Sequence, residues 1–74
     1  MPKLPAVSGD ECIDALQRLG YQATRTSGSH VWLVCPGRTP VPVPKHDELG
    51  HGLLRKIIRM AGINVEEFIE LLKQ

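Results

Sequence analysis

The chain has 74 residues, of which 42% are hydrophobic and only three are aromatic, and its formal net charge is +1. A chain this short buries only about 60% of the surface that its unfolded form exposes, so we expect one small domain over residues 1–74. The sequence contains no apolar run long enough for a membrane span or a signal peptide, which predicts a cytoplasmic protein. Three aromatic residues are also too few for a stacking platform of the kind that binds single-stranded bases.

The charge is unevenly distributed along the chain. Residues 1–17 sum to −2, residues 18–59 to +5 and residues 60–74 to −2. A basic excess confined to the middle is typical of a phosphate-binding face, although a solvated helix surface gives the same pattern.

A capping box predicts a first helix over residues 9–19, after an extended lead-in over residues 1–7. The Ser8 side chain can accept from the Glu11 amide, and the Glu11 side chain can reach back to the Ser8 amide. Gly20 then suits the left-handed position just past the helix end. The apolar residues at helical spacing are Cys12, Ala15, Leu16 and Leu19.

Three strands follow, over residues 21–26, 30–35 and 39–44, with turns at Ser27-Gly28-Ser29 and Pro36-Gly37. They predict an antiparallel meander. The third strand has proline at every second position, which removes the amide donors from one side and predicts an edge strand. The residues between the prolines, Val41 and Val43, should face the core.

Two helices complete the chain. An apolar stripe predicts one over residues 53–61, ending at Gly62, and Asn64 with Glu67 forms a second capping box before a last helix. The order helix, three strands, helix, helix predicts an α+β fold like that of double-stranded RNA-binding domains, with the helices on one face of the sheet.

The alternation of the second strand separates two faces of that sheet. Val31, Leu33 and Cys35 should face the helices, and the intervening His30, Trp32 and Val34 should lie on the open face. The open face is therefore available to a ligand or to a partner protein.

His30 is the residue on which the functional interpretation depends, because imidazole exchanges a proton near neutral pH. RNA carries its own nucleophile, the 2′-hydroxyl. Cleavage needs a base for that proton, a cation for the phosphorane charge and a proton for the leaving 5′-oxygen. One histidine beside a cation meets these needs without a metal. The structural alternative is a strand-start histidine bonded to a nearby carbonyl.

Several other residues are candidates for contact with RNA. Lys45 and Arg25 can bind the phosphate, and the main-chain amides of Gly28 and Ser29 can face a phosphate oxygen. Three further candidates for RNA contact have structural alternatives. His46 can orient its loop, and Arg55 and Lys56 can belong to a solvated helix face.

No metal or cofactor site is expected. His46 and His51 have no third ligand in suitable spacing, and His51 is expected at the surface of a helix start. Cys12 and Cys35 occupy apolar positions, which predicts free thiols.

A set of short motifs occurs in one order along the chain. They are Ser8-Gly9, Leu16 to Gly20-Tyr21, Gly28-Ser29-His30, Val43-Pro44-Lys45-His46, and Gly52 to Ile58 with Ala61-Gly62. In this order they resemble the HicA-type toxins, or YcfA-like family, of bacterial type II toxin–antitoxin systems.

The resemblance implies an mRNA interferase, an endoribonuclease with His30 as the catalytic histidine, and a HicB-like antitoxin as the inhibitory partner. Two alternatives stay open. One is a non-catalytic double-stranded RNA-binding module, and the other is a protein-interaction module that uses the open face with Trp32.

Overall fold

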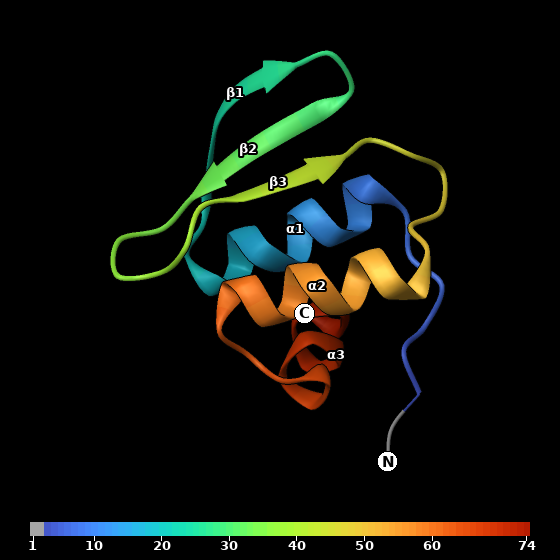
Figure 1. Ribbon diagram of the computed structural model, residues 1–74. Coiled ribbons are helices and arrows are strands. Elements are labelled where there is room, and N and C mark those ends of the chain that lie inside the picture. Colours follow the sequence, from blue (N-terminus) through green and yellow to red (C-terminus); the bar gives the residue numbers. More distant parts are fainter. Residues whose placement is uncertain (1–2) are drawn as a thin grey trace.

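The computed structural model describes residues 3–74 and contains the predicted order of elements (Figure 1). The strands β1 (Gln22–Ser27), β2 (His30–Val34) and β3 (Val41–Pro44) form an antiparallel sheet in the order β1-β2-β3, with β2 in the centre. The helices gather on one side of this sheet, so the predicted α+β architecture is confirmed. The helices are α1 (Gly9–Leu19), α2 (His51–Ala61) and α3 (Val65–Lys73).

Both capping boxes are present. The Glu11 amide donates to Ser8 Oγ at 3.1 Å, and the Ser8 amide donates to the Glu11 carboxylate at 2.9 Å. Asn64 and Glu67 make the same reciprocal pair at the start of α3. The start of α2 differs from the prediction. The helix begins at His51, two residues before the apolar stripe that predicts a start at residue 53.

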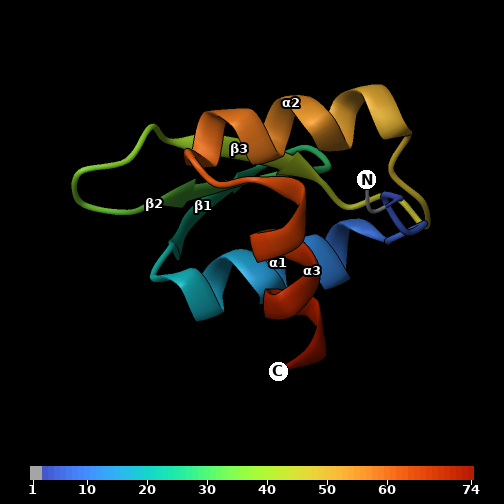
Figure 2. The same ribbon diagram turned by 90° about the horizontal axis from the view of Figure 1, so that it is seen from below.

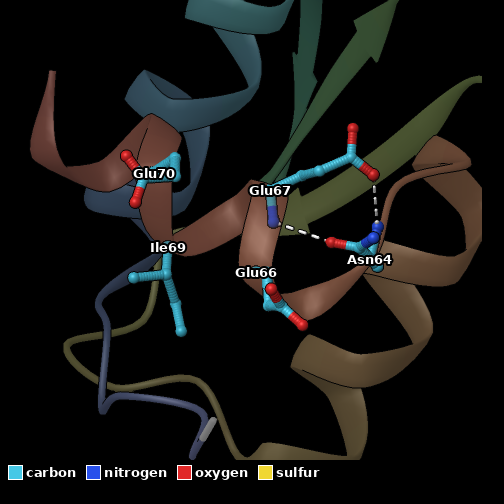
Figure 3. Close-up of a pocket in the computed structure, with 5 residues that line it drawn as sticks. All are labelled: Asn64, Glu66, Glu67, Ile69 and Glu70. Atoms are coloured by element: carbon cyan, nitrogen blue, oxygen red, sulfur yellow. Dashed lines mark hydrogen bonds between the residues drawn. The ribbon is translucent and has the colours of Figure 1, made fainter.

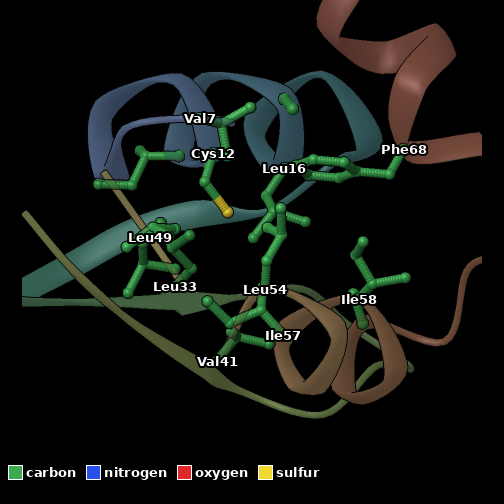
Figure 4. Packing of buried hydrophobic residues seen from close by; sticks show 14 of the residues in the cluster. Val7, Cys12, Leu16, Leu33, Val41, Leu49, Leu54, Ile57, Ile58 and Phe68 are labelled. Carbon is green, nitrogen blue, oxygen red and sulfur yellow. The ribbon is translucent and has the colours of Figure 1, made fainter. Parts of the chain in front are cut away.

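The core lies between the sheet and the helices (Figure 4). Leu33 of β2 is fully buried, whereas His30 and Val34 are exposed, which confirms the predicted alternation. α3 packs against α1 and α2. The side chains that fill the centre include Cys12, Leu16, Leu33, Val41, Leu54, Ile57 and Phe68.

The first strand differs from the expectation that one face of the sheet is covered throughout. All six residues of β1 are exposed, because the β1–β2 hairpin extends beyond the helices (Figure 1). Its anchor is the preceding Tyr21, which is buried and donates its hydroxyl hydrogen to the Thr39 carbonyl at 2.8 Å.

The third strand is the predicted edge. The Lys45 amide donates to the Ser29 carbonyl at 2.7 Å, so odd-numbered residues direct their main-chain groups toward β2. Pro42 and Pro44 therefore direct their amide-free nitrogens to the outer side. Val41 and Val43 are buried, as expected.

A close approach of two main chains joins α1 to the end of β3. The Gly9 amide donates to the His46 carbonyl at 2.9 Å, and a Cβ at Gly9 would overlap the Pro44 carbonyl oxygen. This contact explains a glycine in the first turn of a helix.

The lead-in is part of the same packing. Leu4 and Val7 are buried, and the Leu49 amide donates to the Val7 carbonyl at 2.8 Å. Residues 3–7 have no regular structure, and residues 1–2 of the predicted lead-in lie outside the described residues. Within residues 3–74, no helix has the length and apolar character needed to cross a bilayer.

Candidate functional site

A two-residue turn places His30 at the start of the central strand. Ser27 pairs with His30, and Gly28 between them has φ of +60°. Ser29 has a negative φ, so the turn follows the type II′ pattern, which puts glycine first. The imidazole of His30 is exposed on the open face.

A hollow of about 230 Å³ lies beside His30. We call it the edge hollow, because it crosses the outer side of β3, along which α2 runs (Figure 2). Among the described residues that line it, Lys56 is the only lysine or arginine. Its lining is His30, Pro42 and Pro44 from the sheet and Leu53, Lys56, Ile57 and Met60 from α2.

Arg25 also lies on the open face, because of an irregularity in β1. The register shifts between Ala23 and Arg25, so Arg25 stands opposite Trp32. Its guanidinium carbon is 5.5 Å from the centre of the Trp32 ring, within cation–π distance. Arg25, Trp32 and His30 thus share one side of the sheet.

The structure does not bring Lys45 to that side. Lys45 follows the core-facing positions of β3, and its ammonium lies 3.6 Å from the Asp10 carboxylate of α1. Both side chains are more than half exposed, so the ion pair contributes at most about 1 kcal/mol and can be exchanged. His46 is exposed in the following loop, where its carbonyl accepts from Gly9.

Arg55 and Lys56 are neighbours in sequence but lie on different sides of α2. Arg55 lines a second hollow, of about 300 Å³, together with Arg59 and residues of the α2–α3 junction. Lys56 lines the edge hollow with His30. Consecutive helical residues point about 100° apart, which explains the separation.

Two arginines of the basic middle segment have structural partners. Arg18 donates to the Leu71 carbonyl and Arg38 to the Ala61 carbonyl, both at 2.8 Å. These carbonyls belong to the last turns of α3 and α2, where cations are favourable. The basic excess therefore overstates the charge free to bind phosphate.

The surface of α3 has the opposite character. A hollow of about 370 Å³ is lined by Ile69 and polar or acidic residues (Figure 3). Glu66 and Glu70 contribute carboxylates that would repel phosphate, and Glu67 is held by Asn64. This side of the molecule is a poor nucleic-acid surface.

The Cys12 thiol is not a reactive group. Burial raises the pKa of the Cys12 thiol to about 12, so this group stays protonated at neutral pH. Cys35 is half-buried, and both cysteines are free, as expected. Residues 3–74 contain no cluster of three His, Cys, Asp or Glu side chains that could hold a metal ion.

Sequence reasoning missed the apolar part of the edge hollow. The sequence pattern gives Leu53 only a place in a helix stripe and gives Met60 no role, yet both line the same hollow as His30. The spacing of Leu53, Lys56 and Met60 puts them on one helix side, but only the packing of α2 along β3 brings that side to His30.

The fold and the site together define a small α+β domain whose open sheet face carries an exposed histidine, an arginine and a tryptophan. A family model described as HicA toxin of bacterial toxin-antitoxin matches residues 9–63, from the start of α1 to just past α2. The chain belongs to this HicA toxin family and is thus a toxin of a toxin–antitoxin system, which implies an antitoxin partner. The family is associated in general with ribonuclease activity. No curated protein matches the chain.

Proposed function

We propose that the protein is an mRNA endoribonuclease, an mRNA interferase, in which His30 acts as the general acid/base. The observation that carries the proposal is the position of His30, exposed on the open face with Lys56 across the edge hollow. A histidine that can exchange a proton and a lysine cation that line the same hollow supply two of the groups that phosphodiester transfer needs.

In the proposed reaction the 2′-oxygen forms a bond to phosphorus, and the bond from phosphorus to the 5′-oxygen breaks. His30 takes the proton of the 2′-hydroxyl, and a proton returns to the leaving 5′-oxygen from the imidazolium or from water. The Lys56 ammonium stabilises the charge that develops on the phosphorane oxygens. The products are a 2′,3′-cyclic phosphate and a 5′-hydroxyl, with no metal or cofactor in the reaction.

The other candidate residues would bind the RNA chain. Arg25 lies two residues before Ser27, which pairs with His30 in the hairpin. From there Arg25 can contact a neighbouring phosphate. The Gly28 and Ser29 amides belong to the exposed turn beside His30. Lys45 would exchange Asp10 for a phosphate, while His46 and Arg55 would contact more distant parts of the RNA.

The antitoxin in this proposal is a HicB-like protein that covers the open face in the cytoplasm. Trp32 is half-buried within that face and offers apolar surface to a protein partner. Covering it would also cover His30, two residues away on the same strand.

Incubation of the purified protein with RNA in EDTA tests this proposal. We expect cleavage that persists in the chelator, with 2′,3′-cyclic phosphate and 5′-hydroxyl ends on the products. RNA retention without cleavage would instead favour the non-catalytic RNA-binding module. Absence of RNA affinity at low salt would favour the protein-interaction module.

A further inference from the structure

The edge hollow has more apolar surface than phosphate binding requires. Its α2 side is lined by Leu53 and Met60 as well as by Lys56. Leu53 is 37% exposed, and within residues 3–74 only Val34 is a comparably exposed large hydrophobic side chain. Covering such surface with an apolar or flat group is favourable because it removes apolar area from water, and a phosphate is not such a group. A nucleotide also carries such a group, its base.

The outer side of β3 limits which kind of molecule can occupy the edge hollow. Pro42 and Pro44 line the hollow and have no amide hydrogen to donate. A protein segment that adds to a sheet edge as a strand needs those donors. A nucleobase needs no ladder of main-chain bonds. The volume, about 230 Å³, is also below the roughly 300–1,000 Å³ of pockets for drug-sized ligands.

We propose that the edge hollow is a nucleobase subsite for single-stranded RNA. The base beside the cleaved bond packs on Leu53 and Met60, the phosphate next to it pairs with Lys56, and the 2′-hydroxyl faces His30. The positive charge of Lys56 at the border of an apolar surface matches the anionic phosphate beside an uncharged base. This inference rests on the proposed ribonuclease activity and adds the group that holds the substrate nucleotide.

Steady-state cleavage of a short single-stranded RNA tests the subsite, once its cleaved bond has been mapped. Leu53→Ala and Met60→Ala should each raise KM about tenfold, because each removes apolar surface that covers the base, with kcat little changed. Val34→Ala is the control, because Val34 is about as exposed as Leu53 but lies in β2 outside the hollow, and it should leave both constants unchanged.

Abasic substrates identify the group that occupies the hollow. Removing the base beside the cleaved bond should raise KM for the wild type. With this abasic substrate, Leu53→Ala should cause no further increase in KM. Additive effects of the two changes would overturn the subsite. So would an unchanged KM in Leu53→Ala with a weakened antitoxin complex, because the hollow would then be a protein-docking site.

A binding measurement separates failure of the subsite from failure of the enzyme. Fluorescence anisotropy of a labelled single-stranded RNA with His30→Ala and with His30→Ala/Leu53→Ala requires no cleavage. RNA binding that is roughly tenfold weaker in the double variant than in His30→Ala supports the subsite, even if the wild type cleaves nothing. Equal affinities overturn the subsite even if cleavage is observed.

Discussion

At the scale of single residues, the proposed chemistry depends on how two residues from distant parts of the chain come to line one hollow. His30 is positioned by the Gly28-Ser29 turn, and Lys56 by the packing of α2 along β3. Both border the edge hollow. Neither side chain is expected to matter for folding, since each is exposed.

Lys56→Ala tests the proposed role of the ammonium, with its neighbour Arg55→Ala as the control. Loss of a charge that stabilises the phosphorane should lower kcat for RNA cleavage by about 10²-fold. Arg55→Ala should affect only RNA affinity, because Arg55 lies on another side of α2. Equal losses of kcat in both variants, measured with saturating RNA, would count against a specific role for Lys56.

The buried thiol of Cys12 should make the stability of the fold depend on pH. Burial raises the pKa of its thiol from the ordinary 9.0 to about 12. Between these values the folded protein holds a proton that the unfolded chain releases, so the free energy of unfolding falls as pH rises. From pH 8 to 10 the Cys12 thiol should lower the free energy of unfolding by about 1 kcal/mol.

Urea denaturation at the two pH values measures this change, and Cys12→Ala is the comparison. The variant will be less stable at pH 8 because of the cavity, but its stability should decline less toward pH 10. The same decline in both proteins would show that Cys12 does not cause the pH dependence.

At the scale of elements, the β1–β2 turn requires a backbone conformation that other residues adopt only at a cost. Gly28 has φ of +60°, and an added Cβ would meet no atom within 4 Å. Gly28→Ala should therefore lower the free energy of unfolding by about 1–2 kcal/mol through the backbone alone. It should also weaken RNA cleavage by displacing His30.

Gly52→Ala is the matched control for that substitution. Its Cβ would also meet open space, but Gly52 lies in α2 without a positive φ. Alanine should raise stability there by up to about 1 kcal/mol, because it favours a helix. Chemical denaturation that finds the same sign for both glycines would contradict this assignment of the turn.

The elements also show which parts of the fold sequence reasoning can reach. The capping boxes at Ser8 and Asn64 were predicted because both partners lie within one turn. The buried side of β2 followed from the alternation of Val31 and Leu33. Such signals are local and need no knowledge of the packing.

At the scale of the whole molecule, the features that sequence reasoning missed depend on tertiary packing. Lys45 turns to Asp10 because α1 begins beside the end of β3. β1 is exposed on both sides because the helices end short of the hairpin. The Leu53 side of α2 lines one hollow with His30 only because α2 runs along the edge strand. These contacts join residues far apart in the chain.

The same dependence applies to the basic charge of the molecule. The sequence places seven basic residues in its middle segment, yet Arg18 and Arg38 donate to carbonyls at helix ends. RNA binding therefore rests on the exposed cations near the open face and α2, and on Lys45 once it exchanges Asp10 for a phosphate. This distribution makes His30, rather than overall charge, the critical group of the proposed enzyme.

The most direct test compares the single-turnover rate of RNA cleavage in EDTA by the wild type, His30→Ala and His51→Ala. We predict that His30→Ala cleaves at least about 100-fold more slowly with an unchanged circular dichroism spectrum. His51→Ala, which alters an exposed histidine at the start of α2, should cleave at the wild-type rate. Cleavage by His30→Ala at the wild-type rate would contradict the assignment of His30 as the catalytic group.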